Sequence, residues 1–462
     1  MTPLAVALDL GSTRIKTGVL GDAGNLVDIR SADAPPLAGT GLVRECDARE
    51  YIDTSRRLLE RTLRGTAPDI PVGIASQRSS FLLWDAASGV PATPLISWQD
   101  RRAHEWCRAH ARYNERLSRR TGLRLSPHYA APKLASLLAA DASLRRNVAA
   151  LRFGTLETYF LWCATRGRVH ETDVTMAART LLADPVTGRW DPEWLDVFNV
   201  PEGCLPRIMP TWGRGHELED GGLVTATVTD QAAGVIALLA TTRRGLLVNL
   251  GTGGFVTVPT GKKMKRVDGY LSGPLVRAPD GSTRYTTEGT INGIGTSLSQ
   301  APRVVGELAA CDPLPGVFCS PDSSGVGAPY WRADVPLVLS RSPDSMSPWD
   351  HRRVILEGII FRIAGIVGAL CPRRLPDDLL LSGGLAAEPF IARGLASCLR
   401  HPVRVTREKE STLLGAARLA AGAARTSTPP DVTPVSPAHP SYLPEKFSQW
   451  VAWMDRMLAA QS

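Results

Sequence analysis

A strand–turn–strand pattern occurs twice in this sequence, once in each half. The first copy, LAVALDLGSTRIKTGVL at 4–20, is an apolar run that ends in Asp9, turns through glycine and two hydroxyl residues, and continues as a second semi-apolar run. The second copy, GLLVNLGTGGFVTV at 245–258, aligns Asn249 with Asp9 at an offset of 240 residues. Apolar runs on both sides of a tight turn predict a β-hairpin. Its return after about half the chain predicts a duplicated fold.

The composition is that of a globular protein with about two domains. The chain has 462 residues, of which 44% are hydrophobic and 21% charged, and a single core is not expected at this length. No apolar stretch approaches the length that spans a bilayer, and the N-terminus lacks the pattern of a secretory signal. These features predict a cytoplasmic protein without a membrane partner.

Cysteine and charge patterns argue against several further classes. The eight cysteines are scattered, with no C-x-x-C pair, so we expect neither a zinc site nor a disulfide framework. The net charge is +8, but basic residues are mixed with acidic ones, and the densest basic cluster, KKMKR at 262–266, is short. This pattern argues against a nucleic acid as partner.

Periodicity predicts a similar order of elements in both halves. After the first hairpin, GDAGN predicts a turn into a third strand, and DAREYIDTSRRLLERTLRG predicts a helix capped by Asp47. A buried strand, DIPVGIASQ, and further helices follow at 101–121, 133–140 and 156–166. The second half repeats this scheme. Strands are predicted at 245–249, at 255–259 and at DDLLLSGG, and helices at 350–370, at 389–400 and at ESTLLGAARLAAGAA. A Pro-rich extended stretch then leads to a terminal helix at 445–460.

The first hairpin has two interpretations. Asp, Gly, Ser and Thr are ordinary turn residues, so the segment DLGST at 9–13 could be a turn without chemistry. A carboxylate at the end of a buried strand is costly, however, unless something there uses it. A glycine turn that exposes backbone N–H groups beside hydroxyls, with Lys16 nearby, suits a phosphate. The second copy, NLGTGG at 249–254, favours the phosphate, because two such hairpins facing each other would bind a triphosphate from both sides.

Two other motifs lie where strands end. Gly383 and Gly384 follow the buried strand in LLLSGGLAAEPF, either as a common turn or as a place where the backbone lies flat against an adenine or ribose. Asp230 and Gln231 follow a β-branched run and precede a small-residue helix, so Asp230 is a helix N-cap, a cleft residue, or both. The chain has no G-x-x-x-x-G-K-[ST], G-x-G-x-x-G, H-E-x-x-H or G-x-S-x-G motif. Nucleotide binding would therefore use the duplicated hairpins.

In this order and spacing, the segments resemble the FGGY carbohydrate kinases, within the actin, hexokinase and chaperone-ATPase superfold. The resemblance spans roughly 4–422, and several motifs are closest to glycerol kinases: GLVRECDAREY, GIASQR, ISWQDRRA, TGLRLSPHYAAPK, FGTLETYFLWCATRGRVHETDVTMAARTLL, GVGAPYW and ESTLLGAA. It implies an α/β fold of two ribonuclease H-like (actin/hexokinase-type) domains with a central interdomain cleft. The implied parts are 1–239 with the acceptor site and first phosphate hairpin, 240–425 for the nucleotide, and 426–462 as the Pro-rich connection and terminal helix.

The resemblance also implies an activity and a set of site residues. The implied enzyme is a carbohydrate kinase that transfers a phosphoryl group from ATP, with Mg²⁺, to an alcohol group of a xylulose-like ketose or a glycerol-like polyol. Asp9 would orient Mg²⁺, and Asp230 would be the general base for the attacking hydroxyl. The nucleotide would be bound by Gly11, Ser12, Thr13, Lys16, Gly251, Thr252, Gly253, Gly295, Ser299, Gly383, Gly384 and Glu388. The acceptor would be bound by Gln77, Arg78, Ser79, Trp98, Asp100, His128, Gln231 and Phe255.

Four of these positions depart from the glycerol kinase pattern. Ser79 stands where the family has Glu, and His128 stands where it has Tyr; both positions hydrogen-bond the hydroxyls of the acceptor. A site built to pair a hydroxyl discriminates strongly, so a longer polyol or ketose is expected to be at least as good an acceptor as glycerol. On the nucleotide side, Ser299 replaces Gln and Glu388 replaces Asn.

Two other functional classes share this fold. A catalytically weak or inactive sugar-binding regulatory relative would be favoured by loss of Asp230 or of a phosphate hairpin, and the sequence keeps both. An actin-like assembly or chaperone ATPase would lack the acceptor set QR…SWQDRR…TDQ. The sequence therefore favours a kinase for a small sugar or polyol, with a homodimer as the oligomer to consider.

Overall fold

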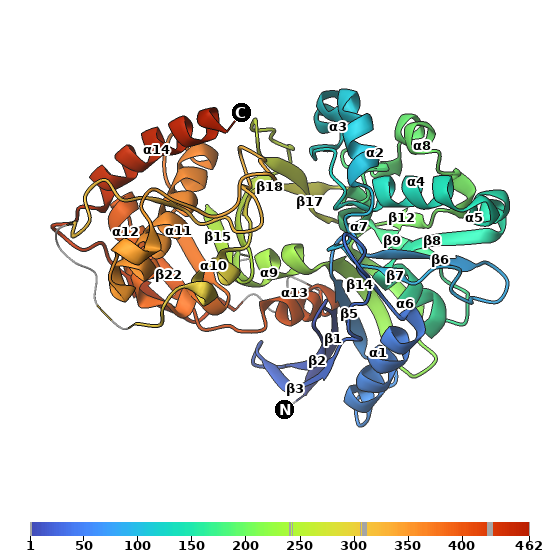
Figure 1. Cartoon of the computed structure of the whole chain (residues 1–462). Coiled ribbons are helices and arrows are strands. Elements are labelled where there is room, and N and C mark those ends of the chain that lie inside the picture. Colours follow the sequence, from blue (N-terminus) through green and yellow to red (C-terminus); the bar gives the residue numbers. More distant parts are fainter. Residues whose placement is uncertain are drawn as a thin grey trace.

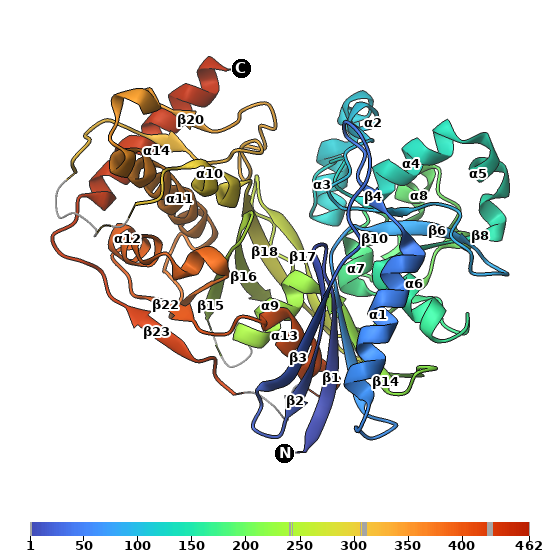
Figure 2. The ribbon, with the colours of Figure 1, turned by 60° about the horizontal axis from the view of Figure 1, so that its bottom comes forward.

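The chain folds into two lobes, each built around a mixed β-sheet (Figures 1 and 2). The computed structural model describes residues 2–239, 242, 244–304, 306, 312–422 and 428–461. The N-terminal strands lie in one lobe and the C-terminal helix lies in the other (Figure 1). The two sheets have related topologies.

The sheet of the first lobe has six strands in the order β13-β14-β5-β1-β2-β3. Strands β1, β2 and β3 are antiparallel neighbours, whereas β1, β5 and β14 run parallel. The bounds are β1 Pro3–Leu10, β2 Arg14–Gly21, β3 Leu26–Asp33, β5 Pro71–Ser76, β13 Trp212–Glu217 and β14 Leu223–Thr229. The first predicted hairpin is therefore β1–β2, and its register places Asp9 opposite Lys16.

The sheet of the second lobe has seven strands in the order β17-β18-β16-β15-β21-β22-β23. Strands β15, β16 and β18 are antiparallel neighbours, and β15, β21 and β22 run parallel. The bounds are β15 Gly245–Leu250, β16 Gly254–Gly261, β17 Leu271–Arg277, β18 Thr283–Ile291, β21 Asp378–Ser382, β22 Val403–Thr406 and β23 Val432–Val435. This arrangement repeats that of the first sheet, so the predicted duplicated α/β fold is confirmed.

Helices cover the outer faces of both sheets. Helices α1 (Ala48–Leu63) and α6 (Leu156–Ala164) form one core with the first sheet, and α11 (Pro348–Leu370), α12 (Pro389–Leu399) and α14 (Leu443–Ala460) form another with the second. Helix α1 begins as predicted, because the Asp47 carboxylate accepts from the backbone N–H groups of Arg49 and Glu50. The short helix α10 (Ile294–Gln300) follows β18.

An insertion in the first lobe carries a small four-stranded sheet, β4-β7-β6-β8, and several helices. The strands are β4 Glu45–Cys46, β6 Phe81–Asp85, β7 Leu95–Ile96 and β8 Leu151–Thr155. The helices are α2 His104–Ala109, α3 Asn114–Thr121, α4 Ala130–Ala140, α5 Ala142–Asn147, α7 Val174–Ala178 and α8 Pro192–Phe198. Short strands complete this region at β9 Glu171–Asp173, β10 Ala183–Asp184, β11 Arg189–Trp190 and β12 Arg207–Met209.

Helices α9 (Asp230–Leu239) and α13 (Ser411–Ala420) lie between the two sheets (Figure 2). One apolar cluster joins side chains of both helices to side chains of both sheets. The helices cross closely: a Cβ atom at Gly415 would lie 1.9 Å from the backbone oxygen of Ala233. Helix α13 also lies on β5, because a Cβ atom at Gly73 would lie 2.1 Å from the Ala416 oxygen. A segment of the second half of the chain thus completes the core of the first lobe.

The second sheet also reaches the first lobe through its edge strand β17. The backbone N–H of Ser272 donates to the Gly122 oxygen at 2.8 Å, and the N–H of Thr211 donates to the Arg277 oxygen at 2.9 Å. The lobes are therefore joined both by the central helices and by this strand.

The Pro-rich stretch after α13 is more ordered than the sequence suggests. It contains β23, which pairs antiparallel with β22 at the edge of the second sheet, and it leads to α14, whose Trp450 and Met454 are buried in the core of that lobe. Residues 428–461 are thus part of the second lobe rather than an extended connection. The predicted boundaries near residues 239 and 425 adjoin residues 240, 241, 243 and 423–427, which lie outside the described ranges.

The described residues contain neither a membrane-spanning helix nor a disulfide. Among the described residues, no helix is both long and apolar enough to cross a bilayer. The seven cysteines that the structure describes are free, and Cys311 lies outside the described residues.

The crossing of α9 and α13 predicts that Gly415→Ala destabilises the fold. The new methyl group would meet the backbone of Ala233 at 1.9 Å, which forces the helices apart, and such overpacking costs about 1–3 kcal/mol. The matched control is Gly365→Ala in α11, where the nearest atom to a new Cβ is 4.0 Å away. That change should stabilise by about 0.5–1 kcal/mol through helix propensity. In denaturant unfolding, Gly415→Ala should lower the free energy of unfolding and Gly365→Ala should raise it. Equal free energies of unfolding for the two variants would contradict the close crossing.

Candidate active site

Asp9, at the end of β1, has a carboxylate oxygen without a partner. Its Oδ1 atom is buried and accepts no hydrogen bond, although the residue as a whole is partly exposed. Burial, and next the nearby Asp230, raise the pKa of Asp9 to about 8 against the opposing effect of Lys16. A buried carboxylate that remains unpaired is expected where a cation binds.

Lys16, opposite Asp9 on β2, is paired with a residue that the sequence analysis did not assign. Its Nζ atom donates to both carboxylate oxygens of Glu410, at 2.8 and 2.7 Å. Glu410 directly precedes α13, so this ion pair joins the first hairpin to the second half of the chain. Lys16 was predicted to contact phosphates, and in this structure its partner is a carboxylate.

The turn between β1 and β2 is tight. A Cβ atom at Gly11 would lie 2.5 Å from the Arg14 oxygen, so only glycine fits. The Gly11 oxygen accepts from the Tyr51 hydroxyl at 2.6 Å, which fixes the turn against α1. Ser12 is partly exposed and Thr13 is exposed, so both hydroxyls are accessible to a ligand.

The second hairpin forms one wall of a pocket of about 350 Å³. Five of the residues predicted to bind nucleotide line it: Gly251, Thr252, Gly295, Ser299 and Gly384. The backbone N–H of Gly295 donates to the Thr252 oxygen at 3.0 Å, so α10 begins directly against the hairpin. The pocket is a site of the right position and size for a nucleoside.

Three further predicted nucleotide residues, Gly253, Gly383 and Glu388, are close in sequence to residues that line this pocket. Gly253 accepts from the Gly251 N–H within the hairpin turn at 2.9 Å. Gly383 has a φ of 90°, a conformation that favours glycine. Glu388 is the residue before α12 and forms an ion pair with Arg352 at 2.8 Å. The residues of the first hairpin do not line the pocket.

Asp230 is the first residue of α9 and directly follows β14. Its Oδ1 atom accepts from the backbone N–H of Gln231 at 2.8 Å and lies 3.9 Å from Nε of Arg78. Burial raises the pKa of Asp230, and Arg78 opposes that rise. The preceding N–H, of Thr229, donates to the Thr175 hydroxyl at 3.0 Å, which ties this corner to α7. The Thr229 hydroxyl, which accepts from the Ala232 N–H at 3.4 Å, occupies the N-cap position, so Asp230 is the first helical residue rather than the predicted N-cap.

Arg78 is bound by a carboxylate from the other half of the chain. Its Nη1 atom donates to the Glu288 oxygens at 3.1 and 3.0 Å, and Glu288, on β18, is only 3% exposed. Arg179, which follows α7, lies 2.9 Å from each Glu288 oxygen. Burial by itself would raise the pKa of Glu288, but Arg179 and Arg78 outweigh it and hold that pKa at about 2. No sequence motif marks Glu288 or Arg179 as a site residue.

The Arg78 guanidinium lies over one aromatic ring, and two further aromatic residues of the predicted acceptor set pair with each other. It lies 5.5 Å from the centre of the Phe255 ring, on β16. Trp98 and His128 form an edge-to-face pair with ring centres 5.0 Å apart. Burial, then the charges of Lys133, Arg78, Arg101 and Arg179, lower the pKa of His128 to about 3. His128 is therefore a neutral ring that either accepts or donates a hydrogen bond.

Ser79, one of the departures from the glycerol kinase pattern, has a strained backbone. Its φ is 64°, in the left-handed region that non-glycine residues seldom adopt. The residue is 2% exposed, and its hydroxyl donates to the Arg179 oxygen at 3.2 Å. Position 79 therefore brings no carboxylate to the neighbourhood of Arg78.

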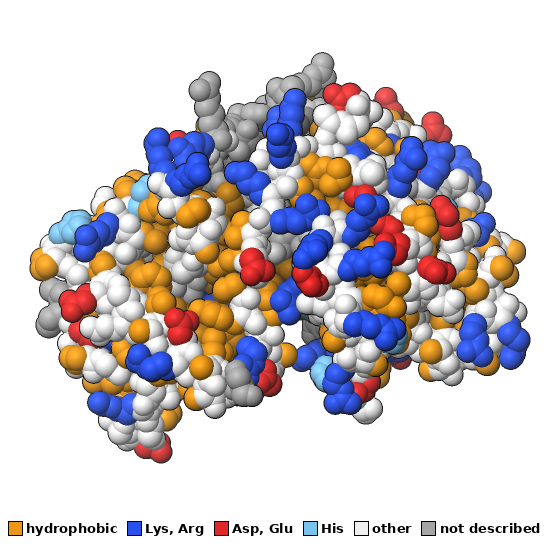
Figure 3. All heavy atoms as spheres, turned by 90° about the horizontal axis from the view of Figure 1, so that it is seen from above, with side chains coloured by type: hydrophobic (Ala, Val, Ile, Leu, Met, Phe, Trp, Pro, Cys, Tyr) orange, Lys and Arg blue, Asp and Glu red, His pale blue; other side chains and the backbone are white. Residues whose placement is uncertain are grey.

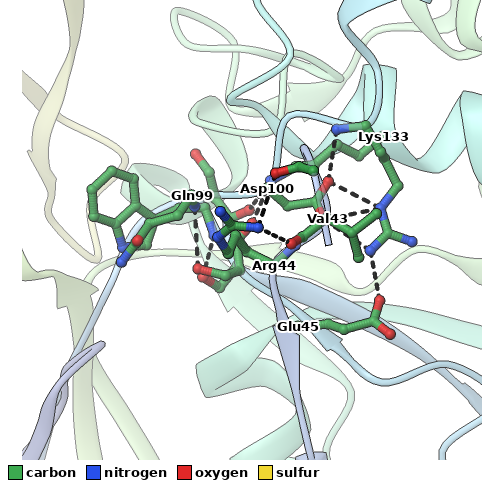
Figure 4. Close-up of polar contacts among 12 residues, drawn as sticks. Val43, Arg44, Glu45, Gln99, Asp100 and Lys133 are labelled. Carbon is green, nitrogen blue, oxygen red and sulfur yellow. Dashed lines mark hydrogen bonds and ion pairs between the residues drawn. The ribbon is translucent and has the colours of Figure 1, made fainter. Parts of the chain in front are cut away.

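Asp100 and Gln77 support the acceptor loops from within. Asp100 is fully buried and accepts from Arg102 and from the backbone N–H of Arg44, the latter at 2.7 Å (Figure 4). Gln77 Oε1 accepts from the Ser80 hydroxyl at 3.0 Å. That hydroxyl oxygen also accepts from the Trp98 N–H at 3.0 Å. These contacts favour a supporting role for Asp100 and Gln77 rather than direct contact with the acceptor.

Lys133, on α4, joins the same two loops. It is completely buried, and Nζ donates to the Ser97 oxygen at 2.8 Å and to the Ser79 oxygen at 3.5 Å (Figure 4). Burial lowers the pKa of Lys133 to about 7, and Asp100 opposes the change. The lysine fixes the distance between the segments that carry Ser79 and Trp98.

The donor set around Asp9 fits a hydrated magnesium ion. Among the described residues, no three His, Cys, Asp or Glu side chains gather into a metal cluster. Mg²⁺ keeps several waters and is bound in nucleotide sites by one or two carboxylates and the phosphates. A single buried carboxylate with an unpartnered oxygen, beside the first hairpin, meets that requirement.

Comparisons with known proteins agree with this geometry. Residues 4–230 match the N-terminal domain, and residues 246–424 the C-terminal domain, of the FGGY family of carbohydrate kinases. A glycerol kinase of Methylobacterium nodulans is 32% identical over 455 residues, which cover 91% of this chain and 89% of the relative. The chain therefore belongs to the FGGY family of carbohydrate kinases, enzymes that phosphorylate a sugar or polyol with ATP.

Solved structures share the fold over nearly the whole chain. A glycerol kinase of Plasmodium falciparum with ADP superposes with a TM-score of 0.86 at 21% identity, and each chain is covered to 98%. A gluconate kinase of Lactobacillus acidophilus gives a TM-score of 0.84 at 19% identity, with 99% of this chain and 98% of that chain covered. The predicted actin/hexokinase-type fold is confirmed by these matches.

The unpaired carboxylate of Asp9 predicts a pH-dependent effect of Asp9→Asn on stability. Because the folded-state pKa is about 8 and the unfolded value about 3.9, the folded wild type loses stability as the pH rises between them. Asn cannot ionise, so the variant avoids this loss. In EDTA and without nucleotide, its Tm should exceed that of the wild type, and by more at pH 8 than at pH 5. The gap should be on the order of a few °C.

Asp100→Asn is the control for this experiment. Burial would raise the pKa of Asp100, but hydrogen bonds from Arg102 and Arg44 lower it overall. Since that group is ionised in both states above pH 5, its replacement should destabilise by a similar amount at pH 5 and pH 8. If the Tm difference between Asp9→Asn and the wild type is also the same at pH 5 and pH 8, Asp9 has a partner in the free protein. The assignment of Asp9 to a cation site is then wrong.

Proposed function

We propose that this carbohydrate kinase binds its acceptor between Arg78, Trp98, His128 and Phe255 and activates it with Asp230. The observation that carries the proposal is the position of Asp230. Its carboxylate is held at the start of α9 by the Gln231 N–H and lies 3.9 Å from Arg78. A base whose pKa burial has raised is suited to accept the proton of an attacking hydroxyl near neutral pH.

The acceptor pocket combines a cation with aromatic faces. Arg78 donates hydrogen bonds to the oxygens of the acceptor, while Trp98 and Phe255 cover the C–H groups of the acceptor. Gln231 follows Asp230 and contributes an amide that both donates and accepts. Neutral His128 contacts Trp98 and contributes one ring nitrogen.

ATP occupies the pocket between the second hairpin, α10 and the Gly383–Gly384 turn in this proposal. The nucleoside lies against Gly295, Ser299 and Gly384, where glycines allow close approach of the ligand. The phosphates extend toward both hairpins, and Ser12, Thr13 and Thr252 donate to them. In phosphoryl transfer such positioning supplies most of the catalysis.

Mg²⁺ is the metal that we assign to this site, with Asp9 as the protein group that orients it through water. When bound, the ion neutralises charge on the transferring phosphoryl group. The first half of the chain, 1–239, supplies Asp9 and the acceptor residues other than Phe255, and 240–425 supplies the nucleotide pocket and Phe255. We assign the protein to the cytoplasm. On the face shown in Figure 3, basic side chains are mixed with acidic ones rather than gathered in one tract, so we assign it no nucleic acid partner.

Asp230→Asn tests the base. The change keeps the size and the helix start but removes proton acceptance, so kcat should fall by about 10²–10⁴. Binding of a non-hydrolysable ATP analogue, measured by calorimetry, should stay within twofold. A variant whose kcat lies within threefold of the wild type would remove Asp230 from the catalytic role.

The acceptor should be longer than glycerol. Relative to the glycerol kinase pattern, Ser79 removes a carboxylate and His128 removes a phenol. The lost hydrogen bond to the charged group costs about 1.5–3 kcal/mol and the lost neutral one about 0.5–1.5 kcal/mol. Two losses should weaken glycerol about 30- to 1000-fold in kcat/KM. We expect a four- to seven-carbon polyol, ketose or sugar acid to have the highest kcat/KM in a panel with glycerol, D-xylulose and D-gluconate.

Two variants of position 79 sharpen this test. Ser79→Glu should shift the preference toward glycerol, whereas Ser79→Gln, of the same size but uncharged, should shift it less. If glycerol is already the best acceptor of the unmodified enzyme, the assignment of position 79 as a specificity determinant is wrong.

A further inference from the structure

Glu288 is a buried carboxylate that the proposed mechanism does not use. It lies on β18, in the second half of the chain, 210 positions from Arg78. Within the described residues, the polar contacts of its carboxylate go to two arginines of the first half: Arg78 Nη1 at 3.1 and 3.0 Å, and Arg179 at 2.9 Å to each oxygen. With both oxygens engaged, Glu288 has little capacity left to bind an acceptor hydroxyl itself.

The register of the second sheet places Glu288 on the face that looks toward the acceptor site. Glu288 pairs with Thr257 of β16, and Phe255 pairs with Thr290 two positions further along. Residues two apart on a strand share a face of the sheet, so Phe255 and Glu288 lie on the same side. Arg78 contacts both, with its guanidinium 5.5 Å from the Phe255 ring centre.

Arg78 keeps donors for the acceptor while Glu288 holds it. Among the described residues, its Nη2 atom makes no hydrogen bond, and its Nε atom lies 3.9 Å from Asp230. An unanchored arginine side chain has many rotamers, and ordering it on binding is costly. The carboxylate of Glu288 therefore fixes the orientation of Arg78 before the acceptor arrives.

Arg179 has two roles in this cluster. It balances the charge, because a buried carboxylate between two arginines is stable only when its hydrogen bonds are satisfied. Its backbone oxygen also accepts from the Ser79 hydroxyl at 3.2 Å, so the same residue fixes the strained position next to Arg78. The short helix α7 that precedes Arg179 is capped by Asp173 and bonded through Thr175 to the corner before Asp230.

We propose that Glu288, anchored by Arg179, is a positioning residue that holds Arg78 for the acceptor and so determines acceptor affinity. The proposal rests on the proposed function, because it assumes that Arg78 binds the acceptor. The second half of the chain then contributes to acceptor binding through Glu288 as well as Phe255, in addition to forming the nucleotide pocket.

The test separates acceptor binding from nucleotide binding. With D-xylulose or glycerol as probe, whichever gives the higher kcat/KM, Glu288→Gln should raise the acceptor KM by about 10- to 100-fold, the loss expected for charge-assisted hydrogen bonds. The Kd for a non-hydrolysable ATP analogue should change less than twofold. In a double-mutant cycle with Arg78→Lys, the two effects should be strongly non-additive, because both variants remove one interaction.

Two further variants allow for misfolding. Glu288→Gln leaves two buried arginines without a counter-charge, so the pair Glu288→Gln with Arg179→Met restores the charge balance and should still show the raised KM. Arg179→Lys keeps the charge but loses the bidentate geometry, and should raise the acceptor KM by about three- to tenfold. The control is Glu357→Gln in α11, a buried carboxylate 2.8 Å from Lys446 and outside the site; its acceptor KM should equal that of the wild type.

The outcomes distinguish the two proposals. If Arg78→Lys leaves the acceptor KM unchanged, the acceptor site itself is misplaced. If Arg78→Lys raises the KM while Glu288→Gln, the charge-balanced pair and Arg179→Lys stay within twofold of the wild type, the site stands and the positioning role of Glu288 is wrong. If Glu357→Gln raises the acceptor KM by as much as Glu288→Gln, the positioning role of Glu288 is also wrong. The loss of a buried carboxylate far from the site would then have the same effect on acceptor binding.

Discussion

The close crossing of α9 and α13 is the contact on which the rest of the structure depends. Each helix follows the last parallel strand of one sheet, and both helices are packed in the layer between the sheets. Gly415 allows the backbones to touch at Ala233. Because Asp230 begins α9 and Glu410 precedes α13, this crossing also sets the position of Asp230, the proposed base, relative to the carboxylate that pairs with Lys16. The architecture and the site thus share one packing constraint.

Local sequence signals were sufficient for much of the fold. The two hairpins, the Asp47 cap and the long helix α11 depend on residues close in sequence, and the structure has them where the pattern predicts. The sequence pattern does not predict strand β17, and around β23 it predicts an extended connection. Strand β17 is anchored partly by backbone bonds to residues of the first lobe, and β23 is a short edge strand whose ladder exists only once β22 is in place. Such strands depend on tertiary partners, which periodicity does not report.

In the candidate site, too, some residues have local sequence signals and others are brought together only by the tertiary structure. Glycine turns and strand-end polar residues have sequence signatures, and five predicted nucleotide residues do line one pocket. Glu288, Arg179 and Glu410 have no such signature, because their partners are 210, 109 and 394 positions away. The segments TDVTMAARTLL and ESTLLGAA were part of the resemblance, yet a charged residue within a motif does not reveal its partner. Only the topology brings these charges together.

The placement of α13 on the first sheet has a consequence for synthesis on the ribosome. The apolar face formed by Ala7, Ala75 and Ala226 is covered by Leu413, Ala416 and Ala417, which are translated about 170 residues after the first half ends. At usual elongation rates that interval is roughly 9–35 s. During it, α9 is the helix of the first half that packs into this cluster, and the share contributed by α13 is absent. The core of the first lobe is therefore complete only after α13, which begins at Ser411, has been synthesised.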